Sequence, residues 1–418
     1  MSDDEKAEFD DVRMRGFSAR HTVEQALAWI DGRTRPLDAV DVPLERAAGR
    51  VLATRIISDV DVPGFDRATM DGYAVVAEST QGATAYNRLP LVVIGDALPA
   101  QPFEGSVAAG QAVRIMTGAP MPAGADAVLP AEWIEEKTAA GDRHVAALAS
   151  VSPGKHVGRT GEDIRRGTTP FEPGRLLRPQ DLGVLSSIGV RDVPVFRQPT
   201  VRLIVTGNEL LPAGSPPHGH QIADANGPML TALVERDGGL VDFPGLVHDE
   251  RGAILNGLRS GADIVIVSGG SSVGIEDHAP ALVAAHGELA IHGIAMRPSS
   301  PTGLGRIDRS LVFLLPGNPV SCLCGYDFFA GRALRALGGR TRSWPYQSVR
   351  APLARKISSP IGRLDYARVQ LVEGIVEPLA IGGAAVLSST TRADGFVIVP
   401  ADSEGFAAGT GVNVWLYA

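Results

Sequence analysis

The chain is poor in residues that support redox chemistry or soft-metal binding. It has only two cysteines, Cys322 and Cys324, which lie two apart in a segment with a helical pattern. Side chains two apart on a helix do not face each other, so we interpret both as small buried apolar residues in a reducing compartment. The sequence also has no CxxC, HExxH or Walker motif. These absences exclude the common dithiol, zinc protease and P-loop sites.

Long apolar runs and basic stripes are missing as well. No uninterrupted apolar stretch is long enough to cross a bilayer, and the acidic start, MSDDEKAEFDD, has no apolar core of a signal peptide. The net charge is −8, which argues against a nucleic-acid partner. With 44% hydrophobic and 21% charged residues, the composition is that of a globular protein, and we expect it in the cytoplasm. A chain of 418 residues is too long for one ordinary core, so we expect two to four domains.

Along the chain, the residue pattern changes several times between one typical of helices and one typical of strands. The first periodic segment predicts a helix after Thr22, whose spacing from Gln25 is that of a capping box, and PLERAAGRVL (43–52) predicts a second helix. Short β-like runs then predict a β-rich region from 61 to about 158. One amphipathic helix follows, led by Pro179.

From Val201 strands and helices alternate over about 140 residues, which predicts a doubly wound parallel sheet. One of its helices is predicted to begin with Asn226 as N-cap. After Trp344 the chain is β-like again, with strand candidates FVIVPA and VNVWLYA.

Ligands of an open parallel sheet bind beyond the carboxyl ends of its strands, and polar loops follow several strands here. The first strand ends in TGNEL with Glu209, another ends in SGGSSVG followed by Asp277, and the last ends in PGNP. The Gly/Ser loop is typical of an anion-binding nest, but turn chemistry alone explains it equally well. Glu209 and Asp277 are equally explained as acids at helix starts. The Gly/Ser loop and the carboxylates together favour Mg²⁺ with a phosphorylated ligand, because Mg²⁺ combines one or two carboxylates with substrate phosphates.

Longer motifs give a more specific indication. The stretches PGFDRATMDGYAV, RIMTGAPMPAGADAVL, GEDI, TGNEL, SGGSSVG and LPGNPVS occur in this order. The sequence resembles the molybdopterin molybdenumtransferases of the MoeA family, to which the C-terminal E domain of gephyrin is related. The resemblance covers the chain from about Thr22 to its end.

The resemblance implies a reaction, a fold and partners. The reaction is the insertion of molybdate into adenylylated molybdopterin, with release of AMP and with Mg²⁺ as cofactor. The fold is an α/β multidomain one: a doubly wound, MogA-like domain, β-rich N-terminal domains and a small C-terminal β-barrel. The partners are a second copy in a homodimer, with the site in a cleft between subunits, and a molybdopterin adenylyltransferase as substrate donor.

The domain boundaries that we expect combine the pattern with this resemblance. They are an acidic tail (1–20), a linker domain (21–61 with 161–198), an inserted β-rich domain (62–160), the molybdopterin-binding α/β domain (199–343) and the barrel (344–418).

The resemblance also assigns site residues one by one. The catalytic candidates are Asp66, Thr117, Asp163, Glu209, Asp249 and Asp277, of which Glu209, Asp249 and Asp277 are also the metal candidates. The cofactor-binding candidates are Ser268, Gly269, Gly270, Ser271, Arg297, Pro316 and Pro319. Purely structural roles stay open as alternatives: Asp163 as a helix-start cap, Pro319 as a helix initiator, and Asp71 as a turn residue that accepts backbone N–H groups.

Several positions depart from the family pattern. Ser300 and Gly293 stand where lysines are frequent, Gly158 replaces a frequent basic residue, and Asn208 replaces an aspartate. The anion site is therefore expected to be poor in cations and to depend on Arg297. Two other functions stay open. One is a molybdopterin adenylyltransferase, against which the 200 additional N-terminal residues argue, and the other is a non-catalytic cofactor-binding scaffold.

Overall fold

The computed structural model describes residues 20–139, 142–270, 278–380 and 383–417. The chain divides into two compact units, one of residues 1–41, 49–53 and 194–418 and the other of residues 42–48 and 54–193. We call them unit 1 and unit 2. The finer boundaries expected from the sequence stay predictions. Within the described ranges, no helix is both long and apolar enough to span a membrane.

Unit 1 contains a seven-stranded sheet in the order β14-β11-β16-β20-β19-β17, with β15 also paired to β11. Strands β14, β15, β11, β16 and β20 run parallel to one another. The expected doubly wound sheet with parallel strands is confirmed, and it continues at one edge with the antiparallel strands β19 and β17. The strands of this sheet are β11 (Thr200–Thr206), β14 (Leu240–Asp242), β15 (Leu246–Val247), β16 (Ile264–Ser268), β17 (Glu288–His292), β19 (Gly303–Ile307) and β20 (Ser310–Leu315).

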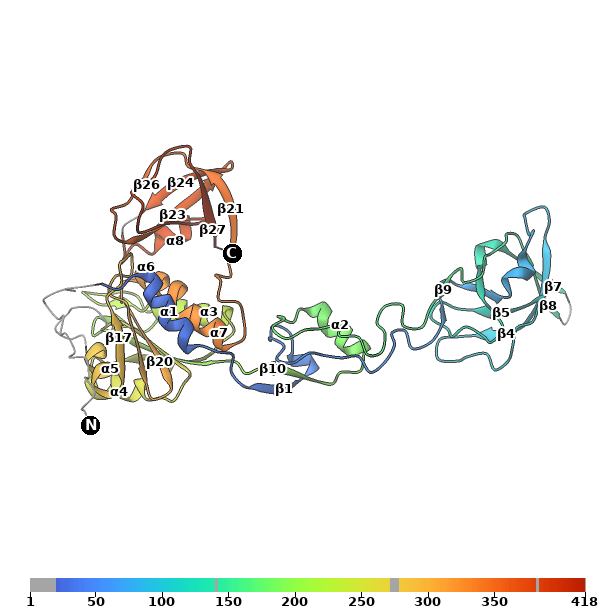
Figure 1. Ribbon diagram of the computed structural model, residues 1–418, viewed down its shortest axis with the longest axis horizontal. Helices are drawn as coiled ribbons and strands as arrows, with labels where there is room; N and C mark the ends of the chain where they lie inside the picture. The colour runs from blue at the N-terminus through green and yellow to red at the C-terminus, as the bar shows by residue number, and fades with distance from the viewer. Residues whose placement is uncertain (1–19, 140–141, 271–277, 381–382, 418) are drawn as a thin grey trace. The chain divides into compact units, whose positions relative to one another are not determined.

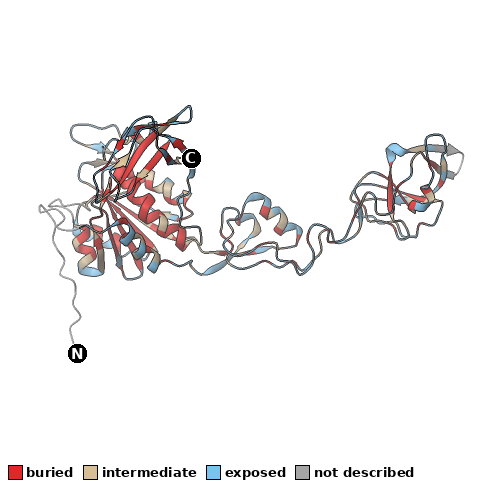
Figure 2. Ribbon diagram, turned by 45° about the horizontal axis from the view of Figure 1, so that its top comes forward, coloured by how far each residue is buried: buried red, intermediate tan, exposed pale blue. Residues whose placement is uncertain are grey.

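Helices cover both faces of this sheet, as Figure 1 shows. Side chains of a strand alternate between faces, so Ile264 and Ile266 of β16 enter one core and Val265 and Val267 enter the other. The first core includes residues of α1, α3, α6 and α7, and the second includes residues of α4 and α5. The central strands β11, β16 and β20 are largely buried between these layers (Figure 2), whereas the edge strands β14 and β17 are partly exposed. The helices are α1 (Val23–Arg33), α3 (Asn226–Arg236), α4 (Arg251–Leu258), α5 (Ala279–His286), α6 (Pro319–Gly325) and α7 (Gly331–Leu337), and a π-helical turn (Tyr326–Ala330) joins the last two.

Two helix starts test the expectations about caps. The capping box is confirmed, because Thr22 Oγ1 accepts from the Gln25 backbone and Gln25 Oε1 accepts from the Thr22 backbone. Asn226 is not the N-cap of α3, since the helix begins at this residue and Ala225 is the cap. The carboxylate of Asp224 accepts from the backbone N–H groups of Asn226 and Gly227 instead, at 2.8 and 2.9 Å.

The C-terminal part of unit 1 is the expected small barrel. Its sheet has the order β18-β23-β25-β27-β21, with β24 paired to β23. A bridge between Leu353, just after β21, and Val376 of β24 closes it. Its strands are β18 (Met296–Arg297), β21 (Gln347–Pro352), β23 (Leu364–Val372), β24 (Ile375–Ala380), β25 (Gly395–Val399) and β27 (Gly411–Leu416), and it also has the pair β22 (Ile357–Ser358) and β26 (Gly405–Phe406) and the short α8 (Ser388–Arg392).

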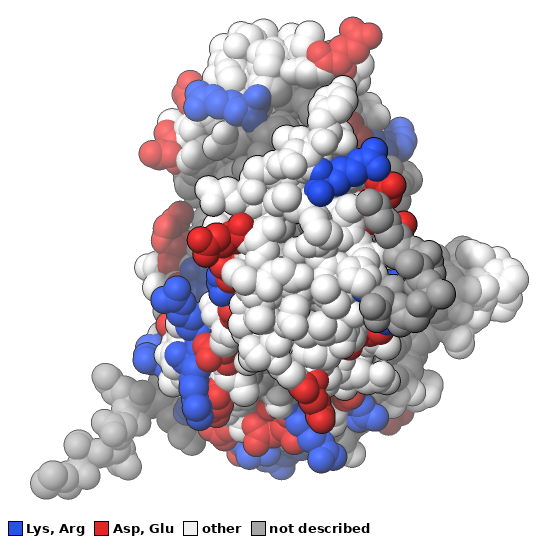
Figure 3. Space-filling model, turned by 90° about the vertical axis from the view of Figure 1, so that its right-hand side faces the viewer, with Lys and Arg blue, Asp and Glu red and all other residues white. Residues whose placement is uncertain are grey.

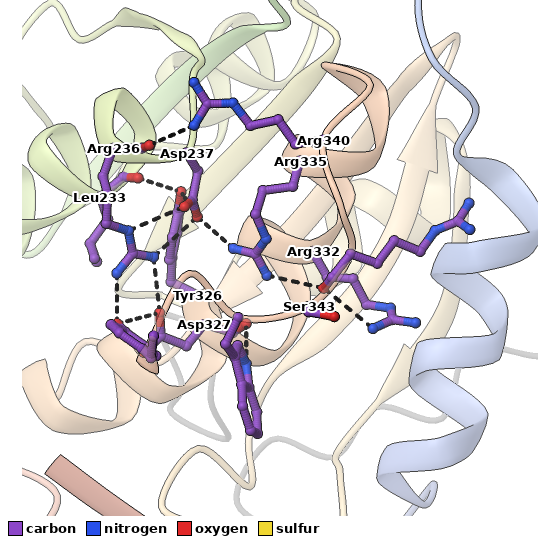
Figure 4. A network of polar contacts seen from close by, with 12 residues as sticks. Leu233, Arg236, Asp237, Tyr326, Asp327, Arg332, Arg335, Arg340 and Ser343 are labelled. Carbon is purple, nitrogen blue, oxygen red and sulfur yellow. Dashed lines mark hydrogen bonds and ion pairs between the residues drawn. The ribbon is translucent and has the colours of Figure 1, made fainter. Parts of the chain in front are cut away.

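A buried polar network lies where α3, the π-helical turn and α7 meet the connection to this barrel (Figure 4). Asp237 accepts from Arg335, Arg236 and Tyr326, and Arg236 also contacts Asp327 and Tyr346. The two carboxylates are 1% and 0% exposed. Paired charges of this kind hold helices in one register, because each ion has lost its water and depends on its partners.

Unit 2 is β-rich, as expected. Its six-stranded sheet has the order β6-β3-β5-β4-β8-β7. The predicted helix over 43–52 is wrong: only a 3-10 helix, Leu44–Arg46, forms, and Gly49 at φ +74° has a conformation that an α-helix does not contain. The elements between positions 39 and 196 are β1 (Ala39–Pro43), β2 (Arg67–Ala68), β3 (Gly72–Val75), β4 (Leu89–Ala97), β5 (Gln111–Ile115), β6 (Ala127–Pro130), β7 (Ile134–Ala139), β8 (Asp142–Ala147), β9 (Val157–Gly158), α2 (Pro179–Ser187), β10 (Asp192–Phe196) and the 3-10 helices Ala77–Thr80 and Ala131–Trp133. Unit 1 also contains the short parallel pair β12 (Leu210–Leu211) and β13 (Ile222–Ala223).

Candidate functional site

Three parallel strands of unit 1 end at the same level. Ser268, the last residue of β16, is in register with Val205 of β11 on one side and with Leu315 of β20 on the other. The three loops that follow these strands therefore begin side by side. This is the edge at which an open α/β sheet binds ligands.

Glycine allows these loops to approach one another closely. A Cβ on Gly269, which has φ +93°, would lie 2.1 Å from the carbonyl oxygen of Thr206. A Cβ on Gly317 would lie 3.5 Å from the Gly269 Cα, and the Gly269 N–H donates to the Leu315 carbonyl at 3.3 Å. No larger residue fits at Gly269, so the SGG and PGN loops depend on it for their contact.

Asn226 links the same loops from the start of α3. Its Nδ2 donates to Ser268 Oγ at 2.9 Å and to the Gly317 carbonyl at 2.7 Å. Its Oδ1 is buried and makes no hydrogen bond within the described ranges. The Ser268 hydroxyl is buried and also lies 3.6 Å from Cys322 Sγ, so it is used inside the fold. Burial raises the pKa of the Cys322 thiol to about 12, which agrees with its interpretation as a small apolar residue.

Two of the predicted metal ligands are described. Asp249 follows β15, and its Oδ1 accepts from the Thr206 hydroxyl and lies 3.8 Å from where a Cβ on Gly270 would be. Glu209 is exposed, and its carboxylate lies beside Gly207 at the end of β11. Asp277 and Ser271 fall outside the described residues, and no group of three metal-binding side chains occurs within them. The metal assignment therefore stays a prediction.

The described donors fit Mg²⁺ in chemistry, since they are hard carboxylate oxygens with acceptor positions to spare. The Glu209 carboxylate makes no hydrogen bond or ion pair with a described residue, and Asp249 makes one hydrogen bond.

A pocket of about 790 Å³ opens beside the PGN loop, between the sheet and the barrel. Three arginines line it, Arg20, Arg297 and Arg363. The other polar or loop residues of its wall include Ser299, Ser300, Pro316, Gly317, Asn318 and Ser321.

Arg297 is in this pocket, as expected for an anion-binding residue, but it is not without a counter-ion. Its Nη2 lies 2.5 Å from Asp365 Oδ2, and Arg363 Nε lies 3.2 Å from Asp365 Oδ1. Asp365 is fully buried and also accepts from the Ser359 hydroxyl at 2.8 Å. Asp365 thus orients Arg297 by a hydrogen bond and lies close to Arg363, and the two guanidinium groups with this one carboxylate leave a net positive charge beside the pocket.

The last loop begins and ends in the predicted prolines. Pro316 lines the pocket, whereas Pro319 is the first residue of α6. The helix-initiating interpretation of Pro319 is thereby confirmed.

In unit 2 the predicted residues form two local pairs. Asp66 accepts from Arg159 at 2.7 Å and from the backbone and hydroxyl of Thr160 at 2.8 and 2.9 Å. The Thr160 N–H and then Arg159 lower the pKa of Asp66. Asp66 is therefore a carboxylate near neutral pH with most of its acceptor capacity already used.

Asp71 and Thr117 form the other pair. Asp71 Oδ1 accepts from the Thr117 backbone N–H at 2.7 Å and from its hydroxyl at 2.8 Å, and the N–H bond is the main cause of the lowered pKa of Asp71. The expectation that Asp71 accepts a backbone N–H group is confirmed, but the donor is Thr117, 46 residues along the chain, and not the backbone of its own turn. Asp163 is exposed and no helix begins there, so its alternative interpretation as a helix cap is wrong.

Comparison with known proteins matches nearly the whole chain. Residues 21–189 match the MoeA N-terminal region (domain I and II), 202–336 a probable molybdopterin binding domain, and 350–417 the MoeA C-terminal region (domain IV). The chain belongs to the MoeA family. This family membership makes it a transferase of molybdenum cofactor biosynthesis.

Relatives of this MoeA protein agree in length as well as in sequence. It is 36% identical over 388 residues to molybdopterin molybdenumtransferase 2 of Mycobacterium tuberculosis, covering 90% of this chain and 94% of that protein. It is 30% identical over 402 residues to the molybdopterin molybdenumtransferase of Staphylococcus aureus strain COL, covering 94% and 95%. A solved structure of the MoeA protein of Pyrococcus horikoshii OT3 has a TM-score of 0.78 at 31% identity, covering 96% and 100%.

Sequence reasoning missed three residues of the MoeA candidate site. Asn226 was interpreted as a cap because it precedes Gly and Pro at a helix start. Asp365 lies in a strand of the barrel, and Ser321 lies in the first turn of α6. The sequence around Asp365 and Ser321 contains no pattern that distinguishes them from structural residues.

Proposed function

We propose that this MoeA family member inserts molybdate into adenylylated molybdopterin and releases AMP, with Mg²⁺ as cofactor. The observation that carries the proposal is the position of Gly317. It contacts the Gly/Ser loop at the carboxyl edge of the sheet, and it also lines the arginine pocket. A nucleotide-binding edge and an oxyanion pocket are therefore contiguous in one unit, as a reaction between a phosphoryl-linked pterin and an oxyanion requires.

The residues of this region have distinct roles in the proposal. Arg297 and Arg363 donate hydrogen bonds to the tetrahedral oxyanion, and Asp365 holds their orientation. The hydroxyls of Ser299, Ser300 and Ser321 supply further donors, in place of the lysine that the family resemblance implies at Ser300. No covalent nucleophile is assigned, because positioning of the two reactants supplies the rate enhancement.

Mg²⁺ would be held by Glu209 and Asp249, together with Asp277 as the resemblance implies, and it would supply positive charge for the phosphate groups. The backbone of Gly269 and Gly270 approaches the ligand closely because neither residue has a side chain. The Oδ1 atom of Asn226, which accepts from no donor among the described residues, accepts from the ligand.

Anaerobic incubation with adenylylated molybdopterin, molybdate and Mg²⁺ tests the activity, with AMP as the product measured. Release that requires molybdate supports the proposal. Consumption of molybdopterin that requires ATP would support the adenylyltransferase instead. Arg297→Ala should raise the molybdate concentration for half-maximal rate by about tenfold or more, because one charged hydrogen bond contributes about 1.5–3 kcal/mol. Arg350→Ala, a matched exposed arginine of β21, should leave it unchanged.

We also propose a cytoplasmic homodimer that receives its substrate from a molybdopterin adenylyltransferase, with Asp66 of one subunit acting at the carboxyl edge of the other. Asp66→Ala and Glu209→Ala homodimers should each be inactive. Their mixture should recover about a quarter of the sites, because half of randomly paired dimers are mixed and each mixed dimer has one intact site. A mixture that stays inactive despite proven subunit exchange would contradict a site shared between subunits.

A further inference from the structure

A second pocket, of about 870 Å³, lies at the opposite edge of the same sheet. Its wall includes Thr200, the first residue of β11, Asp263, which directly precedes β16, and Leu311 near the start of β20. The seven residues of β11 extend over roughly 20 Å at 3.3 Å per residue. The pocket is therefore separate from the candidate site at the carboxyl edge.

Arginines dominate the lining of this pocket. They are Arg33 at the end of α1, Arg197 after β10, Arg306 in β19 and Arg309 in the turn before β20. Among the described residues that line this pocket, Asp263 is the only one with a carboxylate. Such a concentration of positive charge is unusual in a chain of net charge −8, whose basic and acidic side chains lie interspersed on the face shown in Figure 3.

Asp263 does not neutralise the whole set. Its two oxygens accept from Arg197 at 2.8 Å each, and Oδ2 also accepts from the backbone and hydroxyl of Thr200. Burial opposes ionisation of Asp263, but the hydrogen bonds from Arg197 and Thr200 outweigh it and lower its pKa. Asp263 and Arg197 thus form a closed pair with little capacity for another charge.

The remaining arginines keep donor capacity. Arg33 stacks over Trp29 at 4.5 Å and lies 3.4 Å from Glu288, a long contact between exposed groups. Arg306 and Arg309 are exposed, and neither forms an ion pair with a described residue. Two guanidinium groups that line a concave site and form no ion pair with a described carboxylate are suited to bidentate binding of phosphate oxygens.

The pocket also has an apolar part. Leu37, Leu311 and Leu337 line it, and the last two are only 5% and 8% exposed. Apolar surface beside charged donors is the pattern of sites for organic ligands, and the volume is within the range of roughly 300–1,000 Å³ that such sites have. Inorganic anions would leave this surface unused.

We propose that this pocket binds a phosphate-bearing small molecule of nucleotide size, with its phosphates on Arg306 and Arg309 and its ring on the leucines. This binding is independent of the reaction at the carboxyl edge.

Calorimetric titration of the full chain with ADP tests the proposal. Arg306→Ala/Arg309→Ala should weaken ADP binding by about a hundredfold, about tenfold for each lost charged contact. The control Arg46→Ala/Arg350→Ala removes the same charge from two exposed arginines without ion pairs and should change binding less than twofold. Pyrophosphate should bind through the same two arginines but more weakly than ADP, because it has no ring to contact the leucines.

Each other result overturns the proposal. Equal loss in both double variants would show a general charge effect. Loss of ADP binding in Glu209→Ala but not in Arg306→Ala/Arg309→Ala would place the nucleotide at the carboxyl edge. Binding of an acidic peptide, but not of ADP, that depends on Arg306 and Arg309 would make the pocket a protein contact. Absence of ADP binding to the unaltered protein would leave no ligand of the proposed class.

Discussion

Replacing Asp237 by alanine is the most severe test of how unit 1 is held together. Asp237 is 1% exposed, and its carboxylate accepts from Arg335 at 2.7 Å, from Arg236 at 3.1 Å and from the Tyr326 hydroxyl at 3.1 Å (Figure 4). Without it, Arg335 is left 2% exposed with one long hydrogen bond, to the Arg342 carbonyl at 3.4 Å.

Leaving one buried charge without its partner costs about 3–5 kcal/mol. The lower end applies here, because Arg236 can turn fully to Asp327, from which it lies 3.2 Å, and the repulsion between the two carboxylates is relieved. We therefore expect a loss of about 3 kcal/mol in the free energy of unfolding, a large part of the 5–15 kcal/mol typical of a domain.

Asp242→Ala is the matched control. Asp242 pairs with Arg202 at the same 2.7 Å, but its side chain is 57% exposed. Exposed pairs contribute about 0–1 kcal/mol, so this variant should be nearly neutral. The two variants share residue type and the distance to one arginine, so the contrast measures what burial and the additional partners of Asp237 contribute together.

The assay is urea unfolding followed by tryptophan fluorescence, and Trp344 reports on this region because its indole N–H donates to the Asp327 carbonyl at 3.0 Å. Asp237→Asn, which keeps an acceptor but removes the charge, should lie between the alanine variant and the unaltered protein, and it serves if Asp237→Ala does not fold. Equal effects of Asp237→Ala and Asp242→Ala, or a loss below about 1 kcal/mol for Asp237→Ala, would refute the reasoning.

Three further outcomes are expected. Burial raises the pKa of Asp327 to about 6, so Asp327 holds a proton more tightly in the folded protein than in the unfolded chain. The free energy of unfolding of the unaltered protein, relative to that of Asp327→Asn, should therefore fall by up to about 3 kcal/mol as the pH rises from about 4 to about 6.5. A difference between the two proteins that is constant with pH would contradict this. Gly269→Ala should destabilise unit 1 far more than Gly261→Ala, because both have positive φ but only the first would place a Cβ against a backbone oxygen, at 2.1 Å; comparable urea midpoints would show that the loop can shift. Asp71→Ala should speed hydrogen exchange at the Thr117 amide, whose acceptor is lost, and exchange at an unchanged rate would mean that this hydrogen bond does not persist in solution.

Much of the fold follows from local pattern. The alternation of buried strands and amphipathic helices after Val201 indicated a doubly wound domain, because period-2 and period-3.6 patterns each bury one face. The capping box at Thr22 and the helix start at Pro319 were also local, since each involves a residue and nearby backbone, whereas Asp71 accepts from Thr117, 46 residues away. The antiparallel edge of β19 and β17 was not recognised, and the predicted helix over 43–52 failed at Gly49.

The sequence by itself determined the family, the sheet edge where the loops meet, and the candidate residues on those loops, because long motifs and strand-end chemistry are continuous in the chain. Only the tertiary structure decided which groups meet. Asp365, in the barrel, neutralises Arg297 across 68 residues, and Asn226 joins the ends of β16 and β20 across 42 and 91 residues. The four arginines of the second pocket come from segments between positions 33 and 309. Charge pairing and burial depend on distances that folding creates, so no spacing along the chain encodes them.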